Sequence, residues 1–301
     1  MEFDTFKLSG QRWKEEIDVR DFVQQNYTPY EGGPNFLEGP TERTEKIWKE
    51  SSKLLKKERE NDGVLAIDTE TVADINAYDA GYIDKEEEII FGLQTDKPLK
   101  RTLNTYGGIR MARQAAEAYG EEVDPKIDEI FTKYRKTHND GVYDAYTPEI
   151  REIRRSGVIT GLPDAYGRGR IIGDYRRVAL YGVDKLIEAK KEDKRNLKSP
   201  MTEERIRLRE EVSEQIRALK KLKGLGETYG FDLSEPAKDT REAVQWTYLA
   251  YLAAIQENNG AAMSFGRVAE FFDIYIEKDM AEGKLNEKEA QEIIDDFVIK
   301  L

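Results

Sequence analysis

The chain has 301 residues, of which 39% are hydrophobic and 36% charged, and its net charge is −12 at pH 7. This length allows one large domain or two small ones with an ample core. So acidic a surface repels phosphate backbones and anionic lipid, which argues against binding to nucleic acid or to membranes. No apolar run reaches the roughly 20 residues that span a bilayer, and the N-terminus lacks the features of a signal peptide. We therefore expect a cytoplasmic location.

The sequence has no cysteine and one histidine, His138. Without cysteine, this chain cannot form disulfides, thiolate metal sites, iron–sulfur clusters or a cysteine nucleophile. A lone histidine at the end of a predicted helix more often interacts with the helix C-terminus than takes part in catalysis. The segment 74–79 begins like a calcium loop, but Asp79 stands where glycine is required and Lys85 where glutamate is required. We predict no metal site.

Most of the chain is predicted to be helical. Thr41 caps a helix that ends near Asn61, and Asp124 and Thr147, each followed by proline, cap two more. A polar helix is predicted over 12–25, a short strand over 158–160 and an exposed linker near 194–200. Further helices are predicted over 174–191, 202–223, 240–257, 266–282 and 287–301, and 240–257 is apolar enough to be buried.

The last predicted helix has two interpretations. Asn286 and Glu289 resemble a capping box, and the apolar residues from Ala290 to Leu301 form an unbroken stripe. No glycine, asparagine or proline ends the helix. Either the helix ends the protein in this way, or the sequence belongs to a longer protein and the stripe packs against residues outside it.

An arginine- and glycine-rich segment, 166–177, is the strongest candidate for a binding site. Glycines let the backbone approach a ligand, and the two-pronged guanidinium suits a carboxylate or phosphate. The alternative is a surface loop whose arginines pair with acidic side chains. The glycine spacing is one residue too long for a dinucleotide-binding motif, so nucleotide binding is the weakest hypothesis. The residues concerned are Gly167, Arg168, Gly169, Arg170, Gly173, Arg176 and Arg177.

A run of small residues follows the apolar helix, at 258–266. It can form a tight packed turn. It can also form the wall of a pocket in which a larger side chain would collide with a small ligand.

Several blocks of the sequence together resemble the pyruvate formate-lyases, which are glycyl-radical enzymes. These blocks occur in the family's order and spacing, from about residue 11 to Leu301, but they cover well under half of the family's length. The resemblance identifies 1–301 as the N-terminal portion of a pyruvate formate-lyase domain. The blocks are 19–22, 26–32, 79–83, 92–95, 134–139, 156–182, 245–248 and 259–267.

The resemblance implies a helix-rich α/β fold: the N-terminal part of a barrel of two opposed parallel half-sheets surrounded by helices, incomplete in this chain. It implies an acyltransferase that converts pyruvate and coenzyme A to acetyl-CoA and formate, usually as a homodimer. In the full enzyme a glycyl radical, formed by a radical-activating enzyme, generates a thiyl radical on one of two adjacent cysteines. We expect neither coenzyme A nor the radical to be held by this chain.

The resemblance also assigns two site residues. Arg170 corresponds to the arginine that holds the pyruvate carboxylate, and Ala261 to an alanine that lines the substrate pocket. Both fit the residue chemistry described above, a two-pronged donor and a small pocket wall. The cysteine pair and the radical glycine have no counterpart, so we expect no catalytic residue here and no activity without the remainder of the enzyme or a complementing chain. Two alternatives stay open: one half of a split enzyme, or a non-catalytic binding module that kept the scaffold.

Overall fold

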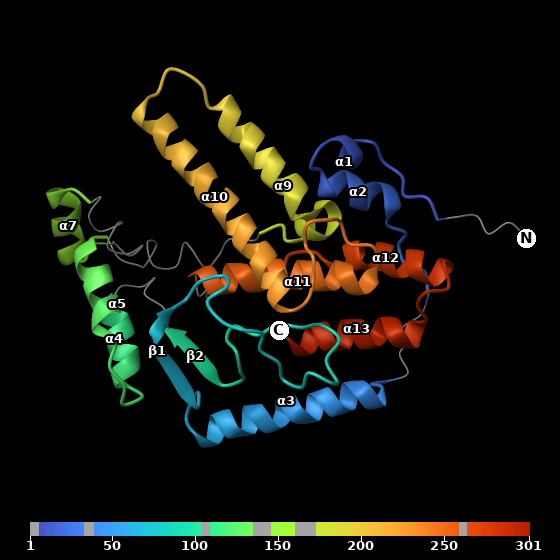
Figure 1. The fold of residues 1–301 in the computed structure, drawn as a ribbon, viewed down its shortest axis with the longest axis horizontal. Coiled ribbons are helices and arrows are strands. Elements are labelled where there is room, and N and C mark those ends of the chain that lie inside the picture. Colours follow the sequence, from blue (N-terminus) through green and yellow to red (C-terminus); the bar gives the residue numbers. More distant parts are fainter. Residues whose placement is uncertain (1–5, 33–38, 104–108, 135–145, 160–172, 259–263) are drawn as a thin grey trace, which may run out of the picture.

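The computed structural model describes residues 6–32, 39–103, 109–134, 146–159, 173–258 and 264–301, which are mainly helical (Figure 1). The elements are α1 Arg12–Glu15, α2 Val19–Asn26, α3 Glu42–Glu60, β1 Ala66–Val72, β2 Lys100–Leu103, α4 Ile109–Glu117, α5 Pro125–Glu129, the π-helical turn η2 Ile130–Tyr134, α7 Pro148–Arg155, α9 Arg176–Asn196, α10 Glu203–Thr228, α11 Thr240–Asn258, α12 Ala269–Ala281 and α13 Glu287–Ile299. None of these helices has the length and apolar character needed to cross a membrane.

The helix starts that the sequence predicted are confirmed by their caps. Thr41, Asp124 and Thr147 each accept a backbone N–H from the first turn of α3, α5 and α7. Asn286 and Glu289 form a complete capping box at the start of α13, with both hydrogen bonds at 3.0 Å. Each cap satisfies an N–H group that the helix itself leaves unpaired.

The predictions differ from the structure at three places. The polar helix over 12–25 is two helices, because Asp18 interrupts it and caps α2 by accepting the N–H of Asp21 at 2.9 Å. Val158 and Ile159 form a bend rather than a strand. The connection between α9 and α10, where the linker near 194–200 was expected, consists of residues 197–202.

The structure contains a two-stranded parallel sheet whose individual strands were not predicted from the sequence. β1 pairs with β2 so that Ala66 lies opposite Lys100, and the register is irregular between Asp68 and Val72. Lys100 forms ion pairs with Asp68 at 3.3 Å and Asp96 at 2.8 Å. The predicted helix-rich α/β class is confirmed, whereas two opposed half-sheets are not seen among the described residues.

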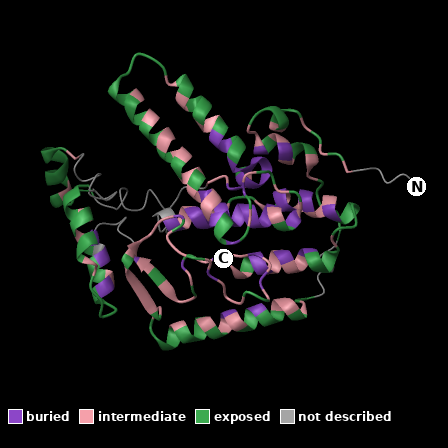
Figure 2. Cartoon of the chain, viewed as in Figure 1, coloured by how far each residue is buried: buried purple, intermediate pink, exposed green. Residues whose placement is uncertain are grey.

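The main core surrounds α11, which contacts α9, α10, α12 and α13. Figure 2 shows burial concentrated in α11 and its neighbours, while the far end of the α9–α10 hairpin is exposed. Val244 and Leu249 of α11 are fully buried, as are Phe271 of α12 and Leu225 of α10. The prediction that 240–257 is a buried helix is confirmed.

The apolar stripe of α13 packs mostly within this chain. Ala290, Ile293 and Phe297 are buried, and the Phe297 ring lies 5.5 Å from that of Phe272. The expectation that the stripe packs against residues outside the sequence is therefore wrong for these three. Only its end, Val298 and Leu301, is well exposed, at 60% and 62%.

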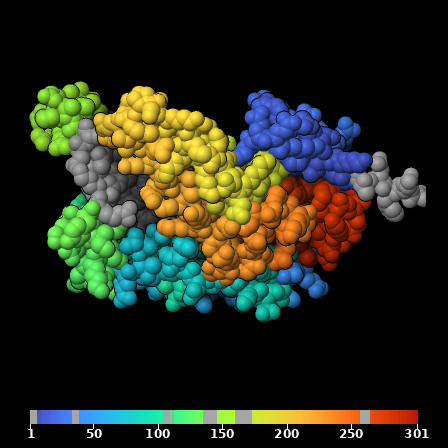
Figure 3. All heavy atoms as spheres, turned by 45° about the horizontal axis from the view of Figure 1, so that its top comes forward, coloured from blue at the N-terminus to red at the C-terminus, as the bar shows by residue number. Residues whose placement is uncertain are grey.

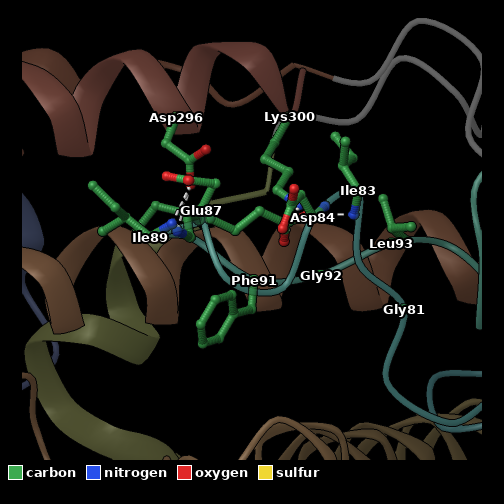
Figure 4. A network of polar contacts seen from close by, with 12 residues as sticks. Gly81, Ile83, Asp84, Glu87, Ile89, Phe91, Gly92, Leu93, Asp296 and Lys300 are labelled. Atoms are coloured by element: carbon green, nitrogen blue, oxygen red, sulfur yellow. Dashed lines mark hydrogen bonds and ion pairs between the residues drawn. The ribbon is translucent and has the colours of Figure 1, made fainter. Parts of the chain in front are cut away.

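An irregular segment, 81–94, crosses the interior between α11 and α13 (Figure 4). Oδ2 of Asp296 accepts the N–H groups of Ile89 and Ile90 at 2.8 and 2.6 Å. Gln245 pairs with both backbone groups of Phe91, accepting at 2.7 Å and donating at 2.8 Å. Side chains therefore supply the hydrogen bonds that a helix or sheet would otherwise supply.

A buried ion pair anchors the same segment to the end of α13. Nζ of Lys300 lies 2.7 Å from Oε2 of Glu88, and both side chains are fully buried. The other oxygen of Glu88 accepts the N–H groups of Ile83 and of Asp84, the latter at 2.9 Å. Burial raises the pKa of Glu88, although Lys300 favours its charged form.

Helix α9 is bent at a glycine. Gly182 has φ 70° and ψ 159°, a conformation that side-chain-bearing residues avoid. The N–H of Val183 donates to the carbonyl of Leu233 at 2.8 Å, which ties the bend to the loop after α10. A Cβ at residue 182 would lie 2.3 Å from the carbonyl oxygen of Ser234.

We predict that Gly182→Ala lowers the free energy of unfolding by about 3 kcal/mol or more, because strain and a backbone clash add. Gly230→Ala is the matched control, since Gly230 also has positive φ but no atom within 4 Å of an added Cβ. The control substitution should lower the free energy of unfolding by only about 1 kcal/mol. Urea denaturation of both variants is the measurement, and equal losses would contradict the prediction.

A pH dependence follows from Asp296. Burial raises the pKa of this carboxyl, so the folded protein keeps a proton that the unfolded chain has already released. The free energy of unfolding therefore falls as pH rises from about 4, the ordinary pKa, through the raised pKa. Asp296→Asn removes this titration while its amide oxygen can still accept the two N–H groups. We predict that the variant gains stability relative to the original protein as pH rises through this window. Denaturation at a series of pH values tests this, and a constant difference would refute it.

Candidate functional site

The predicted site residues Arg170 and Ala261 lie outside the described residues, and so does His138. The structure does describe the segments that adjoin them in sequence. Residues 173–177 are the C-terminal end of the arginine- and glycine-rich segment and include the start of α9. Residues 264–266 are the end of the run of small residues after α11, and Arg267 follows it.

These two segments meet at an aromatic cluster of Tyr175, Tyr251 and Phe265. The Tyr251 and Phe265 rings are 3.9 Å apart, and Tyr175 meets both nearly edge-on, at 5.4 and 5.7 Å. A Cβ on Gly173 would lie 2.8 Å from the Tyr175 ring, so this glycine makes room for an aromatic side chain of the protein itself. Burial raises the pKa of the Tyr175 phenol, which stays neutral at physiological pH.

Arg176 joins the same two segments by hydrogen bonds. Its Nε donates to Oδ1 of Asp174 at 2.7 Å, and its Nη1 donates to the carbonyl oxygen of Arg267 at 2.9 Å. Arg177 is half exposed and lies 3.9 Å from Asp174. For these two arginines the interpretation as ion-pair partners within the protein is confirmed.

The arrangement fixes one end of each predicted binding segment in a common position. Arg176 and Arg267 are 91 residues apart in sequence, and no local pattern reveals a contact of this range. The sequence interpretation therefore missed the contact, although it singled out both segments. The sequence indicated these two segments only through the chemistry of their residues, which are two-pronged donors in one and small residues in the other.

No group of histidine, cysteine, aspartate and glutamate side chains within the described ranges could hold a metal ion. At the rejected calcium loop, Asp74 instead forms an ion pair with Lys221 at 2.6 Å.

The fold resembles known glycyl radical enzymes. It is similar to the glycerol-bound B12-independent glycerol dehydratase from Clostridium butyricum, with a TM-score of 0.59 and 18% identity over 89% of this chain and 40% of that one. It is also similar to a glycyl radical enzyme from Archaeoglobus fulgidus, with a TM-score of 0.53 and 19% identity over 86% and 40%. The fold is thus the one found in part of these enzymes.

Sequence comparison defines the family more narrowly. The chain belongs to the pyruvate formate lyase-like family, whose model matches residues 12–301. It is 54% identical over 299 residues to formate acetyltransferase from Haemophilus influenzae, covering 98% of this chain and 39% of that protein. The resemblance found in the sequence is confirmed, and the chain spans about two fifths of the length of this relative.

We predict that Arg176→Ala loosens the contact between the two segments. Losing hydrogen bonds made by a charged group should lower the free energy of unfolding by about 1–3 kcal/mol and speed amide exchange at residues 264–267. Arg177→Ala removes a more exposed and more distant partner of Asp174. It should change the free energy of unfolding by no more than about 0.5 kcal/mol. Hydrogen exchange by mass spectrometry distinguishes them, and unchanged exchange in Arg176→Ala would count against the contact.

Proposed function

We propose that this chain supplies the substrate-carboxylate site of a pyruvate formate-lyase, an enzyme that converts pyruvate and coenzyme A to acetyl-CoA and formate. Arg170 would hold the pyruvate carboxylate by two parallel N–H bonds, and Ala261 would leave room beside the small substrate. The observation that carries this proposal is 54% identity to a formate acetyltransferase over nearly the whole chain.

The joined flanks support the proposal. Arg170 precedes Gly173 by three residues, and Ala261 precedes Ser264 by three. The flanks are held together by Tyr175, Phe265 and Arg176. The flanks can therefore keep the two binding segments in a fixed position relative to each other. Such preorganisation reduces the cost of ordering a site when a ligand binds.

The reacting groups would come from elsewhere. The family's reaction uses a glycyl radical and a cysteine thiyl radical, and this sequence has no cysteine. The chain's own part is therefore to bind and orient the 2-oxo acid. The remainder of the enzyme or a complementing chain, a radical-activating enzyme and a second copy of the assembly would be its partners.

Binding of oxamate, a stable pyruvate analogue, tests the carboxylate site. Titration calorimetry should give an affinity that falls at least tenfold in Arg170→Ala and less in Arg170→Lys, which keeps the charge but loses the fork. Arg177→Ala is the matched control and should bind as the original chain does. If Arg170→Ala binds oxamate unchanged, the assigned role is wrong.

The isolated chain should form no acetyl-CoA from pyruvate and coenzyme A after treatment with a radical-generating activase. Formate acetyltransferase from Haemophilus influenzae, treated in parallel, is the positive control. Acetyl-CoA formed by this chain alone would overturn the proposal that the reacting groups come from the remainder of the enzyme.

A further inference from the structure

A groove of about 1230 Å³ runs along the α9–α10 hairpin. Its lining includes Gly173, Asp174, Tyr175 and Arg177, which adjoin the candidate site. The rest of the lining comes from α9, α10 and α11 and from residues at the end of α1. In the space-filling view the hairpin forms a ridge beside α1 and α2 (Figure 3).

The groove has a floor of small apolar side chains. Ala189 of α9, Ala218 of α10 and Ala254 of α11 each line it, with Leu219 and Leu222 between them. Small side chains let another backbone approach to the 8–10 Å at which helices pack. Together these side chains form an apolar surface against which the apolar face of another helix can pack.

Charged side chains form the rim of the groove. Six are acidic and three are basic, an excess of three negative charges, so the rim favours a partner with basic residues beside its apolar face. They are Glu15, Glu16, Asp174, Glu188, Glu192 and Asp193, and Arg177, Lys185 and Lys190.

We propose that this groove receives an amphipathic helix from the part of the enzyme that the chain does not span. This inference rests on the proposed function. The chain covers 39% of its Haemophilus influenzae relative, so 61% of that protein lies outside the match. In the proposed enzyme that part brings the reacting residues to Arg170, and the groove begins three residues along the chain from Arg170.

A groove of about 1230 Å³ has room for the side chains of a helix that lies along it. The occupant would carry leucine, isoleucine or methionine at positions i, i+3 or i+4 and i+7, filling the space above the alanines. Lysine or arginine would flank this stripe.

Co-expression provides the assay. The chain is produced with the portion of Haemophilus influenzae formate acetyltransferase that lies outside the match, and the affinity of the purified partners is measured. Ala218→Trp fills the groove and should weaken association at least tenfold. Lys220→Trp is the control, because residue 220 lies about 200° around α10 from residue 218 and is exposed. Circular dichroism and urea denaturation establish that both variants fold.

The absence of cysteine allows a second, site-specific measurement. A single cysteine, Ala218→Cys or Lys220→Cys, can be labelled uniquely with a benzophenone reagent in the purified chain, before it is mixed with the complementary portion. Photolysis should cross-link position 218, and not position 220, to one apolar segment of the complementary portion, which mass spectrometry identifies.

The outcomes separate this inference from the proposed function. If the complex forms acetyl-CoA after activation but Ala218→Trp associates normally and position 218 does not cross-link, the groove proposal fails and the proposed function stands. Cross-linking of position 218 to a second copy of this chain, or no association with the complementary portion, also overturns it. If Ala218→Trp blocks association while Arg170→Ala leaves oxamate binding unchanged, the groove is supported and the substrate site is not.

Discussion

Residues 81–94 pass between α11 and α13 without forming a helix or a strand, and their buried backbone polar groups find partners among side chains (Figure 4). A buried amide without a partner costs about 1–3 kcal/mol. Three polar side chains supply these partners: Tyr229, the residue after α10, Gln245 in α11 and Asp296 in α13. If one of these helices moved along its axis by a turn, its bond would be lost. The position of the helices around α11 is thus set by polar contacts, while apolar packing supplies most of the driving force.

The local part of this architecture could be predicted from sequence because its causes are local. Thr41, Thr147 and Asn286 precede their helices by one residue, and capping depends on only a few positions. The strands were missed because β1, with the sequence AIDTETV, mixes apolar and polar residues without clear alternation, and β2 has four residues. The bend at Gly182 was missed because a single glycine inside a helical pattern is normally tolerated.

The candidate site likewise has features that the sequence could predict and features that it could not. The roles of Arg170 and Ala261 stay predictions, which the family resemblance implies and the chemistry of their segments fits. The contacts that join the neighbouring residues, Tyr175 with Phe265 and Arg176 with the carbonyl of Arg267, depend on how α9 and α11 pack. Periodicity predicts that these helices exist but gives no information on which of their ends meet.

The bend at Gly182 has a mechanical consequence. Beyond it, α9 continues for 14 residues, from 183 to 196, which at 1.5 Å per residue is an arm of about 21 Å. A tilt of about 10° at its base would displace the far end by about 4 Å, more than half of a helical pitch. Val183 N–H donates to Leu233 at 2.8 Å and Asp184 N–H to Ser234 at 3.3 Å at the base of this arm, where a small change in angle becomes a large displacement of the far end. The glycine and these two backbone hydrogen bonds therefore help to fix the direction of the hairpin.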